Sequence, residues 1–132
     1  TEKAAKLIAK TLEEKGAPKV AITDLTRDDM AEAIEDAFRY SKLIIAASSY
    51  DGGVFPPMED FLNRLSHKAY QNRTVGLVEN GSWAPCAARV MKGFVENMKN
   101  ITICDNTVTI KSTLKDADMD SVSALVDEIL NK

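Results

Sequence analysis

The residues between Lys42 and Ser48 constrain the fold more than any other part of the chain. Five apolar residues, Leu-Ile-Ile-Ala-Ala at 43–47, follow one another there without polar alternation. Such a run predicts a β-strand that is covered on both faces, as in a parallel sheet with helices on both sides. It is also the longest apolar run of the chain, far short of the roughly 20 residues that a membrane span needs.

Helical and strand patterns alternate along the rest of the chain. The clearest helical pattern follows Thr26, which we expect to be an N-cap with Asp29 three residues later. Its apolar residues recur at the spacing of one helix face: Met30, Ala33, Ile34, Ala37 and Phe38. We expect further helices over 2–15 (ended by Gly16), from Pro56-Pro57, from Pro85 and at the end of the chain, and strands at Lys19–Thr23, Lys42–Ser48, Thr74–Val78, Ile101–Cys104 and, at an edge, Val108–Ile110.

This order predicts one α/β domain over residues 1–132, a three-layer sandwich with a parallel sheet built by right-handed crossovers. A doubly wound domain normally opens with a strand, whereas this chain opens with a helical pattern. We therefore expect that the first strand of the sheet is missing and that the domain is incomplete at its N-terminus. In a sheet of strand order 2-1-3-4-5, that strand would lie between the strands at 19–23 and 42–48.

A missing inner strand would leave backbone N–H and C=O groups unpaired, at a cost of about 1–3 kcal/mol for each buried group. Three arrangements would relieve this cost. The strand near Lys19 could pair directly with the strand near Leu43, a neighbouring chain could donate a strand, or the protein could extend beyond the sequence given.

Charge and cysteine content exclude several classes of function. The formal net charge is −3 and no basic stripe is present, which argues against non-specific nucleic-acid binding. The two cysteines, Cys86 and Cys104, form no CxxC motif, and His67 is the sole histidine. A metal cage or a disulfide framework is therefore not expected, and a reducing compartment such as the cytoplasm fits.

Two loops after predicted strands combine hydroxyl groups, glycines and an aromatic ring. One covers residues 48–57 and the other residues 79–85. Ligands of open α/β sheets bind outside the carboxyl ends of strands, where free backbone N–H groups and glycines allow close approach. Tyr50 and Trp83 could stack on a planar ring, so the pair of loops favours a flavin. Gly-Gly and Asn-Gly are also ordinary turn formers, and a single tryptophan is often a packing residue, so this alternative stays open.

The stretches Tyr50-Asp-Gly-Gly-Val-Phe-Pro-Pro-Met-Glu-Asp-Phe-Leu, Gln71-Asn-Arg-Thr-Val-Gly-Leu-Val-Glu-Asn-Gly-Ser-Trp-Ala-Pro and Val90-Met-Lys closely resemble the flavodoxin-like domain of flavodiiron proteins. The resemblance covers nearly the whole chain and implies an FMN cofactor. In that family a separate upstream domain carries a di-iron centre that reduces dioxygen or nitric oxide, and rubredoxin or a similar protein supplies the electrons. The ligands of that centre are absent from this chain, so alone it would be a redox domain without a complete catalytic site and without a metal.

The resemblance also assigns residues to the cofactor site. It places the flavin ring between 48–53 and 80–83, and it makes Thr1 the remnant of the phosphate loop. Two positions depart from the family: Asp51 is more often Asn, and Ser48 is often Pro. A carboxylate at Asp51 would disfavour an anionic reduced flavin. The implied cofactor-binding residues are Thr1, Ser48, Ser49, Tyr50, Asp51, Gly52, Gly53, Asn80, Gly81, Ser82 and Trp83.

Two other functions are compatible with this sequence. A phospho-receiver domain has the same kind of fold, with an Asp after the middle strand and a Lys after the last, and Asp51 and Lys111 would have to take these roles. A domain that kept the fold and lost its cofactor would be a structural or interaction module. FMN binding separates the main interpretation from both. The electron donor, the redox potential and a homo-oligomeric state are left open by the sequence.

Overall fold

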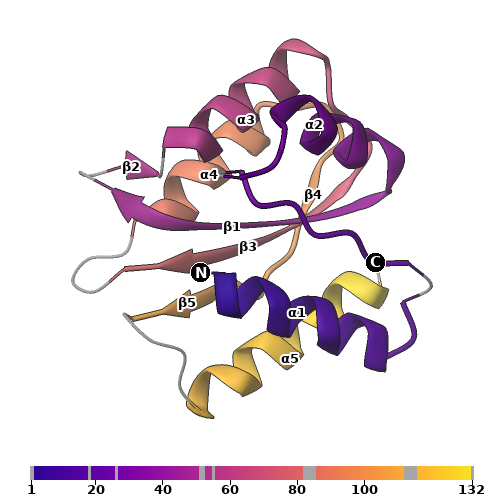
Figure 1. Cartoon of the computed structure of the whole chain (residues 1–132), viewed down its shortest axis with the longest axis vertical. Helices are drawn as coiled ribbons and strands as arrows, with labels where there is room; N and C mark the ends of the chain where they lie inside the picture. Colours follow the sequence, from indigo (N-terminus) through magenta and orange to yellow (C-terminus); the bar gives the residue numbers. More distant parts are fainter. Residues whose placement is uncertain are drawn as a thin grey trace.

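The computed structural model describes residues 2–17, 19–25, 27–50, 53–54, 56–81, 86–111 and 116–131. These residues form five helices and five strands (Figure 1). The elements are α1 (Glu2–Glu14), α2 (Met30–Arg39), β1 (Lys42–Tyr50), β2 (Gly53–Val54), α3 (Pro56–His67), β3 (Thr74–Asn80), α4 (Ala87–Glu96), β4 (Thr102–Ile103), β5 (Val108–Ile110) and α5 (Asp116–Asn131). None of the helices in this described part is long and apolar enough to cross a membrane.

The sheet is built around β3. Strand β1 runs parallel to β3 from Lys42 opposite Thr74 to Ser48 opposite Asn80. On the other side of β3, β4 pairs with its beginning and β5 with its end, both in parallel. The short β2 folds back antiparallel onto the end of β1. The parallel sheet predicted from the alternation of helix and strand is therefore confirmed.

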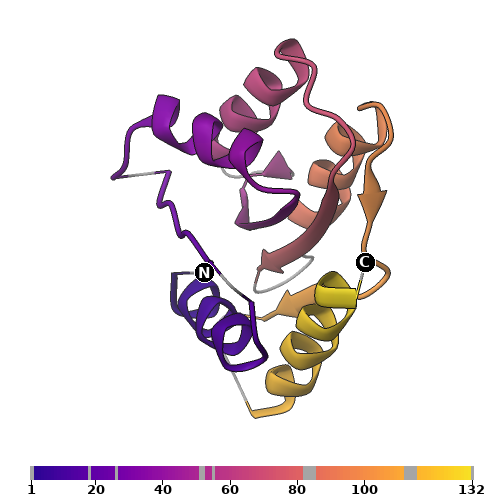
Figure 2. The ribbon, with the colours of Figure 1, turned by 90° about the vertical axis from the view of Figure 1, so that its right-hand side faces the viewer.

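Helices cover both faces of the sheet. Helices α2, α3 and α4 pack on one face and α1 and α5 on the other, as Figure 2 shows with α1 and α5 at the bottom. Alternate residues of β1 belong to the two cores: Ile45 lies in the first, and Ile44 packs against the second. The uninterrupted apolar run at 43–47 thus serves two cores at once, and the three-layer sandwich is confirmed.

Helix ends follow local sequence signals, with one correction. Gly16 follows α1 with a φ of 100°, the left-handed conformation that favours glycine after a helix. Helix α2 begins at Met30, and its N-cap is Asp29, whose side chain accepts a hydrogen bond from the backbone of Ala31. The prediction that the helix follows a cap at Thr26 was therefore wrong, because Asp29 provides the cap closer to the apolar face. Thr26 itself lies outside the described residues.

The strand expected at Lys19–Thr23 is not formed, and this prediction was wrong. Residues 19–23 belong to no helix or strand, and Ile22 is 51% exposed. In Figure 2 the segment runs along the flank of the molecule between α1 and α2. A strand needs a neighbour to hydrogen-bond with, and none of the described strands pairs with this segment. Of the three arrangements considered for the missing strand, the one in which this segment pairs directly with β1 was therefore also wrong.

One edge of β1 is consequently open. Among the described residues, the side of β1 away from β3 pairs only with β2, at Ser49 and Tyr50. No described strand lies on that side of 42–48, although the apolar residues 43–47 are covered on both faces. Natural sheets normally cover or charge such an edge.

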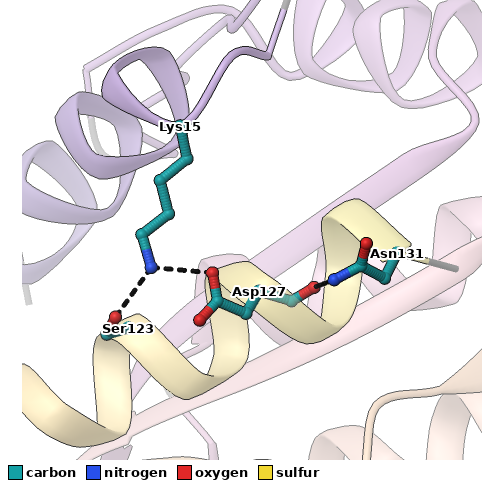
Figure 3. Close-up of polar contacts among 4 residues, drawn as sticks. All are labelled: Lys15, Ser123, Asp127 and Asn131. Atoms are coloured by element: carbon teal, nitrogen blue, oxygen red, sulfur yellow. Dashed lines mark hydrogen bonds and ion pairs between the residues drawn. The ribbon is translucent and has the colours of Figure 1, made fainter.

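Helix α1 is joined to α5 by apolar and polar contacts. Ala4 and Ile8 are buried together with the apolar face of α5. At the end of α1, the Lys15 Nζ donates to the Ser123 Oγ at 2.8 Å and to the Asp127 Oδ1 at 2.7 Å (Figure 3). The polar contacts lie at the surface, so the apolar face supplies most of the attachment.

Candidate functional site

The carboxyl ends of β1 and β3 lie side by side and form the candidate site. Their register places Ser48 directly opposite Asn80, and both residues are half-buried. A serine hydroxyl and an asparagine amide thus stand at adjacent strand ends, where ligands of open α/β sheets bind. An asparagine amide can both donate and accept hydrogen bonds, as the polar edge of a ligand requires.

Strand β2 folds back antiparallel onto the end of β1. Ser49 pairs with Val54 and Tyr50 with Gly53. Strand β2 also contacts α4, the helix that follows the second predicted loop. Residues 53–54 of the first predicted loop thus lie against that helix.

The second loop is held at its beginning by β5. The Gly81 backbone N–H donates to the Ile110 carbonyl oxygen at 3.0 Å, one residue beyond the paired Asn80 and Ile110. The end of β3 is thus fixed on both sides, by β1 at Ser48 and by β5 at Ile110.

A buried carboxylate lies at the base of this loop. Glu79 is 8% exposed, and its Oε1 accepts from the Ala88 backbone N–H at 3.1 Å while its Oε2 accepts from the Thr109 Oγ1 at 2.7 Å. Helix α4 has no acidic residue in its first turn, and its N-cap Cys86 makes no side-chain capping bond. Glu79 therefore caps α4 from the neighbouring strand and satisfies an N–H group that the helix cannot satisfy itself.

The role of Glu79 was missed in the sequence, although a signal was present. Val75, Leu77 and Glu79 alternate on the same face of β3, so the carboxylate is in phase with the buried residues. A charged residue at such a position needs hydrogen-bond partners from other elements. Which partners it finds depends on tertiary structure, because Ala88 and Thr109 are nine and thirty residues away.

The predicted site residues fall into three groups. Ser48, Asn80 and Gly81 are described in full, and the structure brings them together. Ser49, Tyr50 and Gly53 are placed through their backbone in the hairpin. The remaining predicted residues lie outside the described part of the chain: Thr1, Asp51, Gly52, Ser82 and Trp83. For the receiver alternative, Lys111 follows β5, whereas Asp51 is not described.

The opposite end of the sheet carries a purely structural cluster. Arg73, just before β3, donates to the carbonyl oxygens of Phe38, Tyr40 and Gln71 at 3.0, 2.9 and 2.6 Å. It ties the end of α2 to the beginning of β3. Cys104 is buried and His67 ends α3, as residues of the fold rather than of a site. Within the described residues, no group of three His, Cys, Asp or Glu is placed to hold a metal ion.

No protein-family model and no curated protein sequence matches the chain, but solved structures do. Rubredoxin oxygen:oxidoreductase from Desulfovibrio gigas has a TM-score of 0.92 at 17% identity, over 99% of this chain and 32% of that one. A flavodoxin from the domain Archaea has a TM-score of 0.85 at 17% identity, over 99% of this chain and 88% of that one. A mutant flavo di-iron protein from Thermotoga maritima has a TM-score of 0.75 at 26% identity, over 97% and 32%.

This chain has the flavodoxin-like fold. The resemblance to the flavodoxin-like domain of flavodiiron proteins, drawn from the sequence, is confirmed as regards the fold. The chain spans about a third of the length of the rubredoxin oxygen:oxidoreductase and of the flavo di-iron protein, at 32% of each. It corresponds to 88% of the archaeal flavodoxin.

Proposed function

We propose that this chain is an FMN-binding electron-transfer domain. The observation that supports the proposal is the register of Ser48 opposite Asn80, which sets the ends of the two strands that precede the predicted flavin loops side by side. The flavodoxin-like fold supports it, because solved structures with this fold include flavodoxins. The Asn80 amide, which can donate and accept, fits the polar edge of a planar, heteroatom-rich ring.

The proposed roles follow the two loops. Tyr50 and Trp83 border the ring, and Gly52 and Gly53 allow the backbone to approach it. Asn80 and Ser82 hydrogen-bond its polar edge, next to Ser48, Ser49 and Gly81. Asp51 lies beside the ring, and Thr1 contributes to the phosphate site. When bound, FMN supplies the redox chemistry, and the protein sets its exposure and its potential.

The wider setting is part of the same proposal. One of the similar solved structures is a rubredoxin oxygen:oxidoreductase, and another is a flavo di-iron protein. We infer a rubredoxin-like electron donor for this chain, and a di-iron domain that reduces dioxygen or nitric oxide as the electron acceptor. A cytoplasmic location fits the two free cysteines.

The open edge of β1 adds a structural element to the proposal. Along residues 42–48, no described strand pairs with the side of β1 away from β3, and one more strand would cover this edge. We infer that residues 1–132 form a single domain whose sheet is completed by a strand from outside the described residues, either from the same protein or from a neighbouring chain.

Fluorescence titration with FMN tests the proposed function. Trp83 is the sole tryptophan of the chain, so its emission reports directly on the second loop. We expect binding to quench the emission of Trp83 and the fluorescence of FMN itself. Both signals should follow one saturable binding curve. Riboflavin, which lacks the phosphate, separates the ring loops from the phosphate site. Asn80→Ala is expected to weaken FMN binding about five- to tenfold, whereas Asn97→Ala, on the far end of α4, leaves it unchanged.

Three outcomes are informative. Equal binding of FMN and riboflavin means that the ring loops suffice. Binding of FMN alone means that a phosphate site is present as well. Failure of both to bind, in a chain that is folded by circular dichroism, overturns the flavoprotein proposal and supports a structural or interaction module.

A further inference from the structure

We propose that Glu79 is a positioning residue of the flavin site: its buried carboxylate ties the end of β3 to α4 and β5 and places a negative charge next to Asn80, which keeps the reduction potential of bound flavin low. This inference rests on the proposed FMN-binding function. It concerns a residue that precedes the predicted contact residues and was not among them.

The anchoring follows from the two hydrogen bonds of the carboxylate. Glu79 Oε1 accepts from the Ala88 backbone, nine residues further along the chain, and thereby joins the end of β3 to the first turn of α4. Glu79 Oε2 accepts from Thr109 on β5, the strand whose Ile110 also accepts from Gly81. The elements on both sides of the second predicted loop are thus tied to β3 and β5. Elements that are fixed before a ligand binds lose little conformational entropy when it does.

The charge follows from the chemistry of the same contacts. An ionised carboxylate accepts hydrogen bonds on both oxygens, as Glu79 does, and the N-terminus of a helix favours a negative charge. At 8% exposure, water screens this charge weakly. Because reduction adds negative charge to the flavin, a fixed negative charge nearby disfavours the reduced form. Glu79 therefore lowers the reduction potential of bound flavin. A carboxylate at Asp51 is expected to act in the same direction, because it too would disfavour the reduced form.

Two substitutions separate the charge from the anchor. Glu79→Gln removes the charge and keeps a side chain that bonds with both partners, because the Thr109 hydroxyl can accept as well as donate. Thr109→Val keeps the charge and removes one anchor, and Thr109→Ser restores the hydroxyl. Glu96→Gln is the matched control: it removes the same charge from the other end of α4, where Glu96 is exposed and lies 3.7 Å from Lys92.

The readouts are FMN affinity and the midpoint potential of bound FMN. We expect Glu79→Gln to bind oxidised FMN within about threefold of the unchanged chain. Its affinity for reduced relative to oxidised FMN should rise about tenfold, which raises the potential by about 30 mV for a two-electron couple. Glu96→Gln should change neither quantity. If the potential of Glu79→Gln matches that of Glu96→Gln, the proposed effect of the charge is wrong.

Acrylamide quenching of Trp83 without FMN tests the anchor independently of the cofactor. We expect faster quenching in Thr109→Val and a return to the original rate in Thr109→Ser, with FMN affinity lower by about three- to tenfold in the valine variant alone. Unchanged quenching and affinity in Thr109→Val would overturn the anchoring role. If the unchanged chain fails to bind FMN, the proposed function fails, while the quenching series still decides whether Glu79 and Thr109 hold the loop.

Discussion

At the scale of a single residue, Tyr70 shows how burial changes the pKa of a side chain. Its side chain is 1% exposed, the Phe38 ring meets it edge-on at 5.3 Å, and the Arg73 guanidinium lies 5.3 Å from its ring centre. Its hydroxyl has no hydrogen-bond partner among the described residues. Burial raises the pKa of Tyr70 from 10.0 to about 12, although the charge of Arg73 lowers it in part.

The raised pKa predicts how stability depends on pH. The phenol of the unfolded chain ionises near pH 10, and that of the folded chain near pH 12. The contribution of Tyr70 is therefore fully present below pH 10 and is lost between pH 10 and 12, at up to about 1.4 kcal/mol per pH unit. Tyr70→Phe should abolish this component in urea unfolding, and at pH 7 it should leave the free energy of unfolding unchanged or raise it by about 1 kcal/mol, because an unpaired hydroxyl is lost. The same pH slope in both proteins above pH 10 would contradict the assignment.

Gly76 is required by close packing rather than by backbone conformation. A Cβ at this position would lie 3.0 Å from the Leu125 Cδ1 and 3.4 Å from the Ile44 Cγ1. Leu125 is fully buried, so it has little room to move. We expect Gly76→Ala to lower the free energy of unfolding by about 1–3 kcal/mol. Gly93→Ala is the control: nothing lies within 4 Å of a Cβ there, and alanine in a helix should stabilise by about 0.5–1 kcal/mol. Urea unfolding measures the free energy of unfolding of both variants. If Gly76→Ala destabilises the protein no more than Gly93→Ala does, the packing argument is wrong.

At the scale of the element, α2 depends on its cap. The Asp29 Oδ1 accepts from the Ala31 backbone at 3.1 Å, and α2 begins at the next residue after Asp29. We expect Asp29→Ala to lower the free energy of unfolding by about 1 kcal/mol. Glu35→Ala, in the exposed middle of the same helix, should change it by less than about 0.5 kcal/mol. A loss that is no larger in Asp29→Ala than in Glu35→Ala would show that the cap is dispensable.

Helix α1 depends on its apolar face. Ile8 is 3% exposed in the second core, whereas the side chains of Lys15 and Asp127 are 32% and 59% exposed. We expect Ile8→Ala to cost about 2–5 kcal/mol and Lys15→Met less than about 1 kcal/mol. Thermal or urea unfolding of the two variants makes the comparison. A larger loss in Lys15→Met would mean that the surface contacts of Figure 3 hold the helix.

At the scale of the whole molecule, the open edge of β1 predicts a pattern of amide exchange. In a parallel strand, alternate N–H groups face opposite sides, so about half of those in β1 face the open edge. In the chain of residues 1–132 by itself, without the completing strand inferred above, we expect these amides to exchange faster than the amides of β3, which has β1 on one side and β4 and β5 on the other. Native-state hydrogen exchange measures both. Protection throughout β1 equal to that of β3 would show that a further strand, from elsewhere in the protein or from a second copy, covers the edge.

The sequence predicted most elements because their signals are local. The apolar run at 43–47, the helix face that begins at Met30 and the alternation at Val108–Ile110 each need only neighbouring residues, and all three were confirmed. The segment 19–23 carries a similar apolar pattern but forms no strand. A strand is stabilised by pairing, and pairing cannot be inferred from one segment alone.

The candidate site divides in the same way. The residue types of the two loops, the glycines and the aromatic rings, could be read from the sequence and led to a flavin. Which residues of the two strand ends lie opposite one another could not be read from the sequence, because this depends on the register of Ser48 with Asn80. The partners of Glu79 were beyond sequence analysis for the same reason, since Ala88 and Thr109 reach it only after β5 and α4 have packed on β3.

By itself, the sequence determined the apolar faces of the helices, the strand that is covered on both faces, and the residue types that follow the strand ends. Periodicity and residue type are sufficient for these, because burial of apolar surface is the dominant favourable term in folding. Tertiary structure alone decided which strands pair, that segment 19–23 stays outside the sheet, and that a carboxylate of β3 caps α4. These features depend on hydrogen bonds between residues far apart in the chain, and such bonds form only in the assembled fold.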